Sequence, residues 1–437
     1  MAELAANPAA SRPVRASRGR LVVWALFALL LCALPWMFRS SLALSMLSQM
    51  GYLAIICLSY NILLGQGGML SFGHAVYTGL GAFLALHAMN LATKGTIWLP
   101  VAAVPIVGGL AGMGFSLLFG YVTTKKSGTT FAMITLGIGE LVAAMSLMFP
   151  GFFGGEGGIT TNRTYGSHPL GFTYGPQIQV YYLIAAYCFV CTALMYAFTG
   201  TPLGRMLNAV RDNPERVEFI GYDTQWVRYL GFVIAGFFAG VGGALSAINF
   251  EIVNASDGLS TVRSGGYLLF TFLGGATFFF GPMIGAVLLV LASVLLSEVT
   301  KAWLLYLGLV FLLMVMYAPG GIASLVMMNL RVAKFGKFAR VAPWYALLLV
   351  AALPMALGIG ALIEMVYHVQ LNEAQGPTLH FLGVELNVKS ALSWLGAGML
   401  ALVGGALFEA ARRIFARHWG EVQGEIEAAI RAKEGGA

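Results

Sequence analysis

Long runs of apolar residues, separated by short polar segments, extend along almost the whole chain. About 20 such residues suffice for a helix to cross the hydrocarbon core of a bilayer, which is roughly 30 Å thick. The first run follows a basic segment, but it is long for a secretory signal and lacks a small-residue cleavage site, so we interpret it as a retained span. The runs predict spans near residues 21–37, 42–64, 71–89, 97–122, 128–149, 178–199, 229–249, 264–280, 282–300, 302–318, 343–366 and 389–409.

The composition supports this interpretation. Of 437 residues, 59% are hydrophobic and 10% are charged, whereas soluble domains carry about 25% charged residues. The 56 glycines suit membrane helices that pack closely through small side chains. We therefore predict an all-α fold: a polytopic helical membrane protein with about 10–12 transmembrane helices, some of them broken.

The positions of the basic residues predict the topology. Cytoplasmic segments of membrane proteins carry an excess of Lys and Arg. If the arginine-rich N-terminus is cytoplasmic, the predicted crossings place 19 of the 25 Lys and Arg residues on the inside. Both termini are then cytoplasmic. The six basic residues left on the outside are Arg39, Lys94, Arg163, Arg263, Lys301 and Lys389.

The cytoplasmic loop 201–226 contains two helix-start signals. Thr201-Pro202 and Asn213-Pro214 each place a capping residue before a proline at the first helical position, and Gly221 supplies a stop. The loop therefore predicts two short amphipathic helices with a sharp turn between them. Such an elbow could dock a soluble partner, or it could lie on anionic lipid through its arginines, and the pattern alone does not separate these two readings.

Glycine clusters interrupt two of the apolar runs, at Gly65–Gly68 and at Gly274–Gly285. Backbone groups freed by such breaks must be satisfied by protein or by a watery cavity, and discontinuous helices often mark transport sites. By contrast, Gly236 and Gly240 have the spacing of a simple helix-packing pair.

Glu140 is an ionisable residue well inside an apolar span, a costly position that suggests function, although a hydrogen-bonded structural role is an equal alternative. His74 is a weaker candidate of the same kind. Together with the first glycine break, these positions form our set of candidates for a translocation pathway: Gln66, Gly67, Gly68, Ser71, His74, Thr135 and Glu140.

The sequence shows no catalytic or nucleotide-binding motif. In the string nearest to a phosphate-binding loop, Gly120 to Ser127, Lys125 stands where the second glycine is required. No metal-ligand cluster or nucleophile elbow is present, and the four cysteines lie in apolar runs. We therefore expect a protein that is not an enzyme and holds no metal or cofactor, so that any ATP hydrolysis occurs on another chain. Nucleic acid is not an expected partner.

Several motifs, taken together, resemble the permease subunits of branched-chain amino acid ABC importers, specifically the LivM type. The matching stretches occur in the family's order and are NILLGQGGMLSFGHAVYTGLGA (61–82), SGTTFAMITLGIGEL (127–141), FGGEGGIT (153–160), TPLGRMLNAVRDNPERVEFIGYD (201–223), FVIAGFFAGVGGAL (232–245), FLGGATFFFGPMIGA (272–286) and YAPGGI (317–322).

This resemblance implies a multi-pass subunit of a bacterial or archaeal inner membrane. It implies as partners a second, LivH-like permease, two ABC ATPase subunits that carry ATP-Mg, an external substrate-binding protein and the lipid bilayer. It also implies that the loop 201–226 is the coupling loop that docks on the ATPase. The residues that match the coupling motif are Arg205, Arg211, Asp212, Pro214, Glu215 and Gly221.

The domain organisation follows from the same comparison. Residues 1–20 form a cytoplasmic arm, 21–330 the permease domain, and 331–437 an extension with two further spans and a cytoplasmic tail. We expect the tail, 409–434, to be a surface or interfacial helix. Lys125-Lys126 and residues 257–267 depart from the family pattern.

Two functions remain open at this point. The first is an ABC importer permease for branched-chain amino acids or a related small polar solute such as urea, an amide or an aromatic acid. The alternative is a stand-alone secondary transporter or channel in which Glu140 is a proton or ion site.

Overall fold

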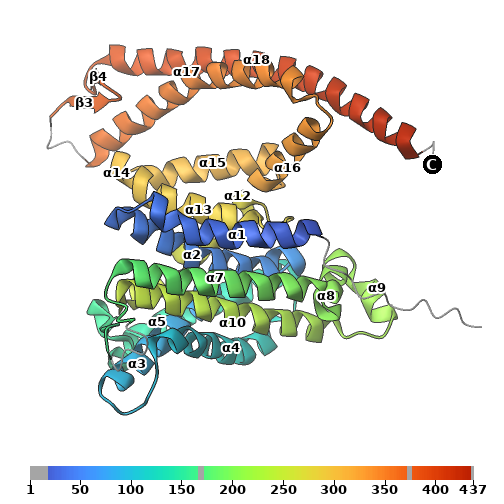
Figure 1. Ribbon diagram of the computed structural model, residues 1–437. Helices are drawn as coiled ribbons and strands as arrows, with labels where there is room; N and C mark the ends of the chain where they lie inside the picture. Colours follow the sequence, from blue (N-terminus) through green and yellow to red (C-terminus); the bar gives the residue numbers. More distant parts are fainter. Residues whose placement is uncertain (1–17, 166–171, 372–375, 435–437) are drawn as a thin grey trace, which may run out of the picture. The chain divides into compact units, whose positions relative to one another are not determined.

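The structure is a computed structural model that describes residues 18–165, 172–371 and 376–434. In these ranges the chain is almost entirely helical, with only two short antiparallel sheets of two strands each, so the predicted all-α class is confirmed (Figure 1). Most of the predicted N-terminal arm, 1–17, lies outside the described residues. The chain forms two compact units, 1–268 and 269–437, and each is considered by itself.

The first unit contains most of the predicted spans. Its elements are α1 (Arg18–Met37), α2 (Ser41–Asn61), the π-helical turn η1 (Ile62–Gln66), α3 (His74–Thr93), η2 (Val101–Ala103), α4 (Val104–Thr123), α5 (Gly128–Met148), α6 (Pro150–Phe153), η3 (Gly155–Gly157), β1 (Ile159–Thr160), α7 (Gln177–Gly200), α8 (Pro202–Asp212), α9 (Pro214–Phe219), α10 (Thr224–Phe250), β2 (Ile252–Val253), α11 (Ala255–Gly258) and the start of α12 (Thr261–Gly274).

Helix α10 is the centre of this unit, and it packs against α2, α3 and α4. Its glycines allow close approach to α4: a Cβ at Gly240 would collide with the Gly108 carbonyl, and one at Gly236 would collide with Ser116. The predicted packing pair is therefore confirmed, and small residues bring the two backbones together.

The two ends of α7 and α10 carry different structures (Figure 1). At one end lie α8 and α9, and at the other β1 pairs with β2. There, the Arg163 guanidinium donates to the carbonyls of Ile248 and Asn249, at 3.4 and 3.1 Å, while the Arg163 N–H donates to Glu251 Oε1 at 2.8 Å. The loop after α5 is thereby fastened to the last turn of α10.

The second unit contains the rest of α12 and a long helical hairpin. Its further elements are α13 (Gly281–Val290), the π-helical segment η5 (Leu291–Leu296), α14 (Ser297–Val299), α15 (Trp303–Tyr317), α16 (Gly321–Lys334), α17 (Phe338–Leu371), β3 (Thr378–Phe381), β4 (Val384–Asn387) and α18 (Ala391–Glu434).

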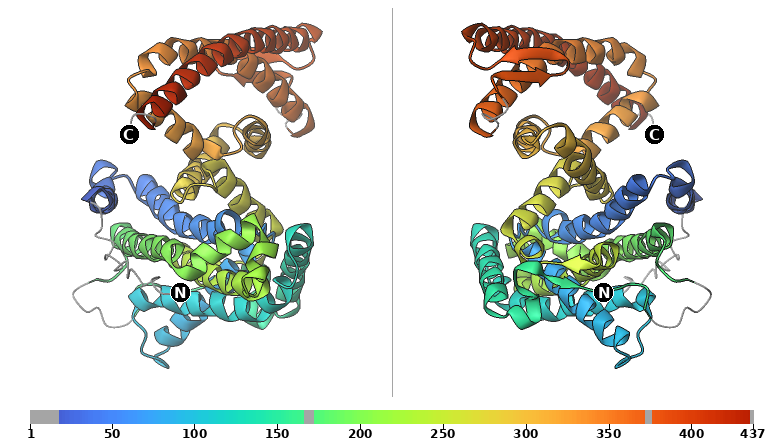
Figure 2. Two further views of the ribbon diagram at one scale, coloured as in Figure 1. Left: turned by 90° about the vertical axis from the view of Figure 1, so that its right-hand side faces the viewer. Right: turned by 90° about the vertical axis from the view of Figure 1, so that its left-hand side faces the viewer.

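The hairpin of α17 and α18 follows the last of the motif stretches quoted above, which ends at residue 322. The two helices pack along their length (Figure 2), and Gly358 and Gly404 bring their backbones into contact. Glu364, inside the α17 span, accepts hydrogen bonds from Thr300 and, at 3.1 Å, from the Tyr306 hydroxyl. A partly buried carboxylate therefore joins α17 to the residues around α14 and α15.

The tail, 409–434, is helical as predicted, and it is continuous with the last span. The last span and the tail form one helix of 44 residues. No proline interrupts it, Glu409 pairs with Arg412 and Arg413 within it, and Val422 and Ile426 are buried against Val332 and Val341. Local ion pairs and packing against α16 and α17 therefore continue the helix past the apolar run.

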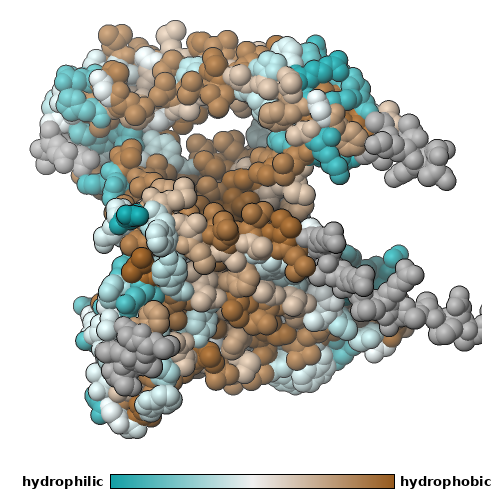
Figure 3. Space-filling model, viewed as in Figure 1, coloured by the Kyte–Doolittle hydropathy of each residue, from teal (hydrophilic) through white to brown (hydrophobic). Residues whose placement is uncertain are grey.

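In the described residues, nine helices are long and apolar enough to cross a membrane, or ten if the bent pair α15–α16 counts as one span. These nine correspond to nine of the twelve predicted runs. The run 21–37 is a shorter apolar helix, and 302–318 is α15, bent by 51° from α16. The run 264–280 is not a span, because α12 ends at Gly274 and Gly275 takes a φ of +117°. Figure 3 shows apolar surface along the middle of the helices and polar surface toward their ends.

Gly240→Ala tests the contact between α4 and α10. We expect a loss of about 1–3 kcal/mol, because the added methyl group overpacks a backbone contact. Gly114→Ala on α4 is the control, since its Cβ would meet nothing within 4 Å. Thermal unfolding of the detergent-solubilised protein measures the difference, and equal melting temperatures would contradict the assigned packing.

Candidate functional site

The loop 201–226 forms two capped helices, as its pattern predicts. Thr201 Oγ1 accepts from the Gly204 N–H at 3.2 Å and starts α8, and Asn213 Oδ1 accepts from the Arg216 N–H at 3.1 Å and starts α9. Gly221 has a φ of +90°, a conformation that glycine adopts without strain. The elbow is therefore a rigid structure whose turns are fixed by its own side chains.

One face of α8 is buried against other helices of the first unit. Leu207 is fully buried, and its methyl carbons would lie 3.3 Å from a Cβ at Gly67 and 2.9 Å from a Cβ at Gly231. Val210 and Val217 are also buried. The elbow is thus packed against the break after α2 and against α10.

The opposite face of the elbow exposes large apolar side chains that our sequence analysis did not single out. Phe219 is 88% exposed and Ile220 is 67% exposed, and Tyr222 and Trp226 are about half exposed. The signal in the sequence is the apolar pair directly before the Gly221 stop, in an otherwise charged loop. Exposed apolar clusters of this kind are typical of protein-interaction surfaces.

The six residues of the coupling motif all belong to this elbow. Arg205 and Glu215 are exposed, and Glu215 lies in the first turn of α9, where the helix dipole favours a negative charge. Arg211 pairs with Asp212 at 2.9 Å. Pro214 opens α9 and Gly221 follows it.

The chain breaks after α2 where the glycine cluster predicted it. The helix widens into the π-turn η1, Gly68 takes a φ of +62°, and α3 begins only at His74. The break is in contact with α8: Asn208 Nδ2 donates to Gln66 Oε1 at 2.6 Å, and Arg211 Nη1 donates to the Gly65 carbonyl. Gln66, Gly67 and Gly68, which we assigned to a pathway, therefore lie against the elbow.

A buried polar cluster surrounds the segment that leads into α3. The Tyr60 hydroxyl donates to the Ser71 carbonyl at 2.7 Å and accepts from the Ser71 N–H at 3.1 Å. The Phe72 N–H donates to Thr135 Oγ1 at 3.1 Å. Side chains of α2 and α5 therefore satisfy backbone groups that the break leaves without a helical partner.

His74 is fully buried at the start of α3. Its Nε2 lies 2.9 Å from the Ser59 hydroxyl, and its ring meets those of Tyr60, Tyr77 and Tyr267 edge-on. Ser71, His74 and Thr135 thus lie together in one cluster, inaccessible in this conformation.

Glu140 lies apart from that cluster, on the outward face of α5. It is exposed, and its carboxylate accepts a hydrogen bond of 2.5 Å from Thr261 Oγ1 at the start of α12. Gly137, one turn earlier, faces open space. Our sequence analysis missed Thr261, and also Ser264, whose hydroxyl accepts from the Ala75 N–H at 2.9 Å, because both contacts join segments far apart in the chain.

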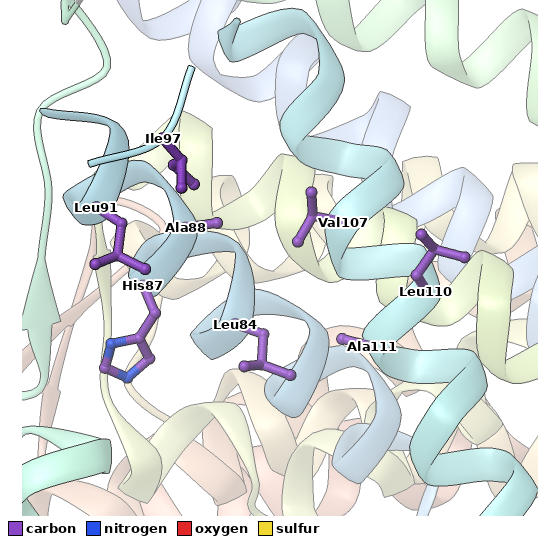
Figure 4. A pocket seen from close by; sticks show the side chains of 8 residues that line it. All are labelled: Leu84, His87, Ala88, Leu91, Ile97, Val107, Leu110 and Ala111. Atoms are coloured by element: carbon purple, nitrogen blue, oxygen red, sulfur yellow. The ribbon is translucent and has the colours of Figure 1, made fainter. Parts of the chain in front are cut away.

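An apolar pocket of about 430 Å³ lies between α3 and α4 (Figure 4). It is lined mainly by aliphatic side chains, and the one polar residue, His87, lies 2.8 Å from the Phe152 carbonyl through its Nε2. Leu91, Ile97 and Leu110 in its wall are each 40–55% exposed. Such a lining suits a hydrocarbon chain and offers a polar solute almost no partner.

The described residues contain no group of three His, Cys, Asp or Glu side chains that could hold a metal ion. Cys57, Cys188 and Cys191 are buried, Cys32 is exposed, and none of these four described cysteines forms a disulfide.

Comparison with known proteins identifies the family. Residues 42–319 match the family model described as branched-chain amino acid transport system / permease component. The chain belongs to this permease family. The matched region contains the break, the polar cluster, Glu140 and the whole elbow, and it ends before the hairpin of α17 and α18.

Two curated relatives are high-affinity branched-chain amino acid transport system permease proteins LivM, from Escherichia coli K12 and Salmonella typhimurium LT2. Each is 26% identical to the permease over 333 residues, which cover 70% of this chain and 76% of the relative. A third is the nucleoside ABC transporter permease protein NupC of Lactococcus lactis, 24% identical over 220 residues, 46% of this chain and 65% of the relative. No solved structure matches the chain.

The permease is therefore a multi-pass inner-membrane protein and a membrane component of an ABC importer. Its relatives carry the names of transport permeases. The predicted boundary between the permease domain and the extension at residue 330 stays a prediction, as do the roles of the individual site residues.

Gly68→Ala tests the contact between the break and α8. Gly68 and Gly128 share a φ of +62°, but a Cβ at Gly68 would lie 2.6 Å from Arg211 Cγ, whereas one at Gly128 meets nothing within 4 Å. Both substitutions carry the left-handed backbone cost of about 1–2 kcal/mol. We expect Gly68→Ala to lose at least about 1 kcal/mol more through overpacking. Thermal unfolding of the two variants measures this, and equal losses would show that α8 does not press on the break.

Proposed function

We propose that the permease works in a complete importer with a second, LivH-like permease, two ABC ATPase subunits and an external binding protein. The α8–α9 elbow docks on an ATPase subunit in the cytoplasm, and ATP-Mg is bound there and not by this chain. The observation that carries the proposal is the exposed apolar tip of the elbow, Phe219 and Ile220, held in place by two capped helices.

The geometry of the elbow favours a protein partner over the lipid surface. Of its three arginines, Arg211 already contacts Asp212 and Gly65, so fewer cations are free for anionic headgroups. Acidic residues, Asp212, Glu215 and Glu218, share the same surface and would be repelled by such a membrane. Exposed aromatic anchors beside mixed charges are typical of protein interfaces.

The same proposal fixes the orientation. With α8 and α9 in the cytoplasm, the end that carries β1 and β2 faces outward, toward the binding protein. The N-terminus, six predicted spans before the elbow, is then cytoplasmic as well, in agreement with its arginines.

The outward face of α5 provides one wall of the proposed pathway. A carboxylate that faced lipid near the middle of a span would be costly, whereas Glu140 is exposed and its neighbour Gly137 opens on empty space. A water-filled path shared with the second permease removes this cost. Branched-chain amino acids are the first substrates to test, because two relatives carry that name, and related small polar solutes follow.

Purification of the tagged permease in mild detergent, with mass spectrometry of its partners, tests the assembly. We expect a second permease and ATPase subunits in fixed ratio. A permease that purifies alone and moves solute in proteoliposomes without ATP would instead support the stand-alone transporter that uses Glu140.

Phe219→Ala tests the docking surface. We expect the affinity for the purified ATPase subunits to fall about 30-fold, the effect of losing roughly 2 kcal/mol at an interface anchor. Leu118→Ala, on α4 and 63% exposed, is the control and leaves the affinity unchanged. Titration of labelled ATPase into solubilised permease measures both, and wild-type affinity for Phe219→Ala would rule out this surface.

Glu140→Gln tests the pathway wall. We expect ATP-driven uptake to slow about tenfold, equivalent to roughly 1.4 kcal/mol at the limiting step, while the ATPase still copurifies. Glu427→Gln, an exposed carboxylate on α18, is the matched control. Uptake by reconstituted complexes is the measurement, and unchanged uptake by Glu140→Gln would assign this carboxylate a structural role.

A further inference from the structure

The elbow and the helix break are joined by two polar contacts as well as by packing. Leu207, Asn208 and Arg211 have the spacing that places them on one side of α8, and all three meet the break: Leu207 at Gly67, Asn208 at Gln66 and Arg211 at Gly65. The contact therefore involves consecutive residues of the break and not a single point.

The break supplies a free acceptor for this contact. In a regular helix the Gly65 carbonyl would accept from the N–H of residue 69. Here the Met69 N–H donates instead to the Leu63 carbonyl, at 2.9 Å, because the π-turn and the positive φ of Gly68 redirect the chain. The Gly65 carbonyl therefore lacks its helical donor and faces α8. The Arg211 guanidinium takes the place of the missing N–H donor.

Polar atoms without partners lie on both sides of the break. Among the described residues, Asn61 Oδ1, Ser71 Oγ and His74 Nδ1 are buried and have no hydrogen-bond partner. Buried polar atoms without partners are rare and costly. A second arrangement of residues 67–73 that gave these atoms partners would recover part of this cost.

We propose that Asn208 and Arg211 are positioning residues that hold this break in one of two arrangements. Movement of the elbow releases or restores the two contacts, and residues 67–73 carry the change to the buried cluster at the start of α3. This inference rests on the proposed function for its driving force, since the ATPase moves the elbow, but the contacts themselves can be tested on the isolated chain.

Hydrogen exchange on the purified full chain provides the first test. Asn208→Ala and Gln66→Ala each remove the same hydrogen bond, and we expect amides 62–75 to exchange about tenfold faster in either variant, with an unchanged melting temperature. Gln66→Glu keeps an acceptor and retains slow exchange. Asn329→Ala, which removes a contact with Tyr345 in the second unit, is the control. Wild-type exchange in Asn208→Ala would overturn the proposal.

Transport by the reconstituted importer provides the second test. Solute moved per ATP hydrolysed should fall about fivefold or more in Asn208→Ala and in Gln66→Ala, and the double variant should be no worse than either, because residues in one contact are not additive. Gln66→Glu restores the ratio.

The outcomes separate the two proposals. Fast exchange with an unchanged transport ratio, or additive losses in the double variant, would overturn the positioning role. A wild-type complex that assembles but shows no ATP-driven uptake would overturn the proposed function, while hydrogen exchange would still report on the contact.

Discussion

Every interruption of a helix in this permease must find its hydrogen-bond partners within the protein, because lipid offers none. The break at Gly65–Gly68 shows how this is done. Tyr60 and Thr135 satisfy the backbone of Ser71 and Phe72, Ser264 satisfies Ala75, and Arg211 satisfies Gly65. Side chains of α2, α5, α8 and α12 therefore supply hydrogen-bond partners to the break and to the start of α3.

This requirement also links the two parts of the proposed mechanism. An elbow that contacted the membrane-spanning helices only through apolar side chains could slide along them with little effect on their backbone. Because α8 takes the place of a missing helical hydrogen bond, it is part of the structure of the break. The elbow's own caps, Thr201 and Asn213, keep it stiff enough to transmit a displacement instead of absorbing it.

The sequence predicts the local features well because their causes are local. Nine spans, the caps of α8 and α9 and the break before Ser71 follow from apolar runs, capping residues and glycines. The contact of Asn208 with Gln66 spans 142 positions and has no local signal. The apolar residues around Glu140 and His74 do not show that one is exposed and the other buried.

The ends of the longer helices depend on tertiary packing, which the pattern of apolar residues in the sequence does not reveal. The run 264–280 has the composition of a span, but its glycines permit a sharp turn that ends α12 at Gly274. The tail after residue 409 lacks an apolar run, and it continues α18 because Val422 and Ile426 find an apolar surface on α16 and α17.

The fastening of Arg163 to the last carbonyls of α10 has a mechanical consequence. With 27 residues, α10 is a rod about 40 Å long, and it rests on α8 at one end and is gripped by the loop after α5 at the other. A stiff rod that is held at both ends cannot tilt at one of them alone. In the proposed importer, an elbow that tilts this helix on one side of the bilayer therefore also displaces the loop on the other side, without any solute passing between them.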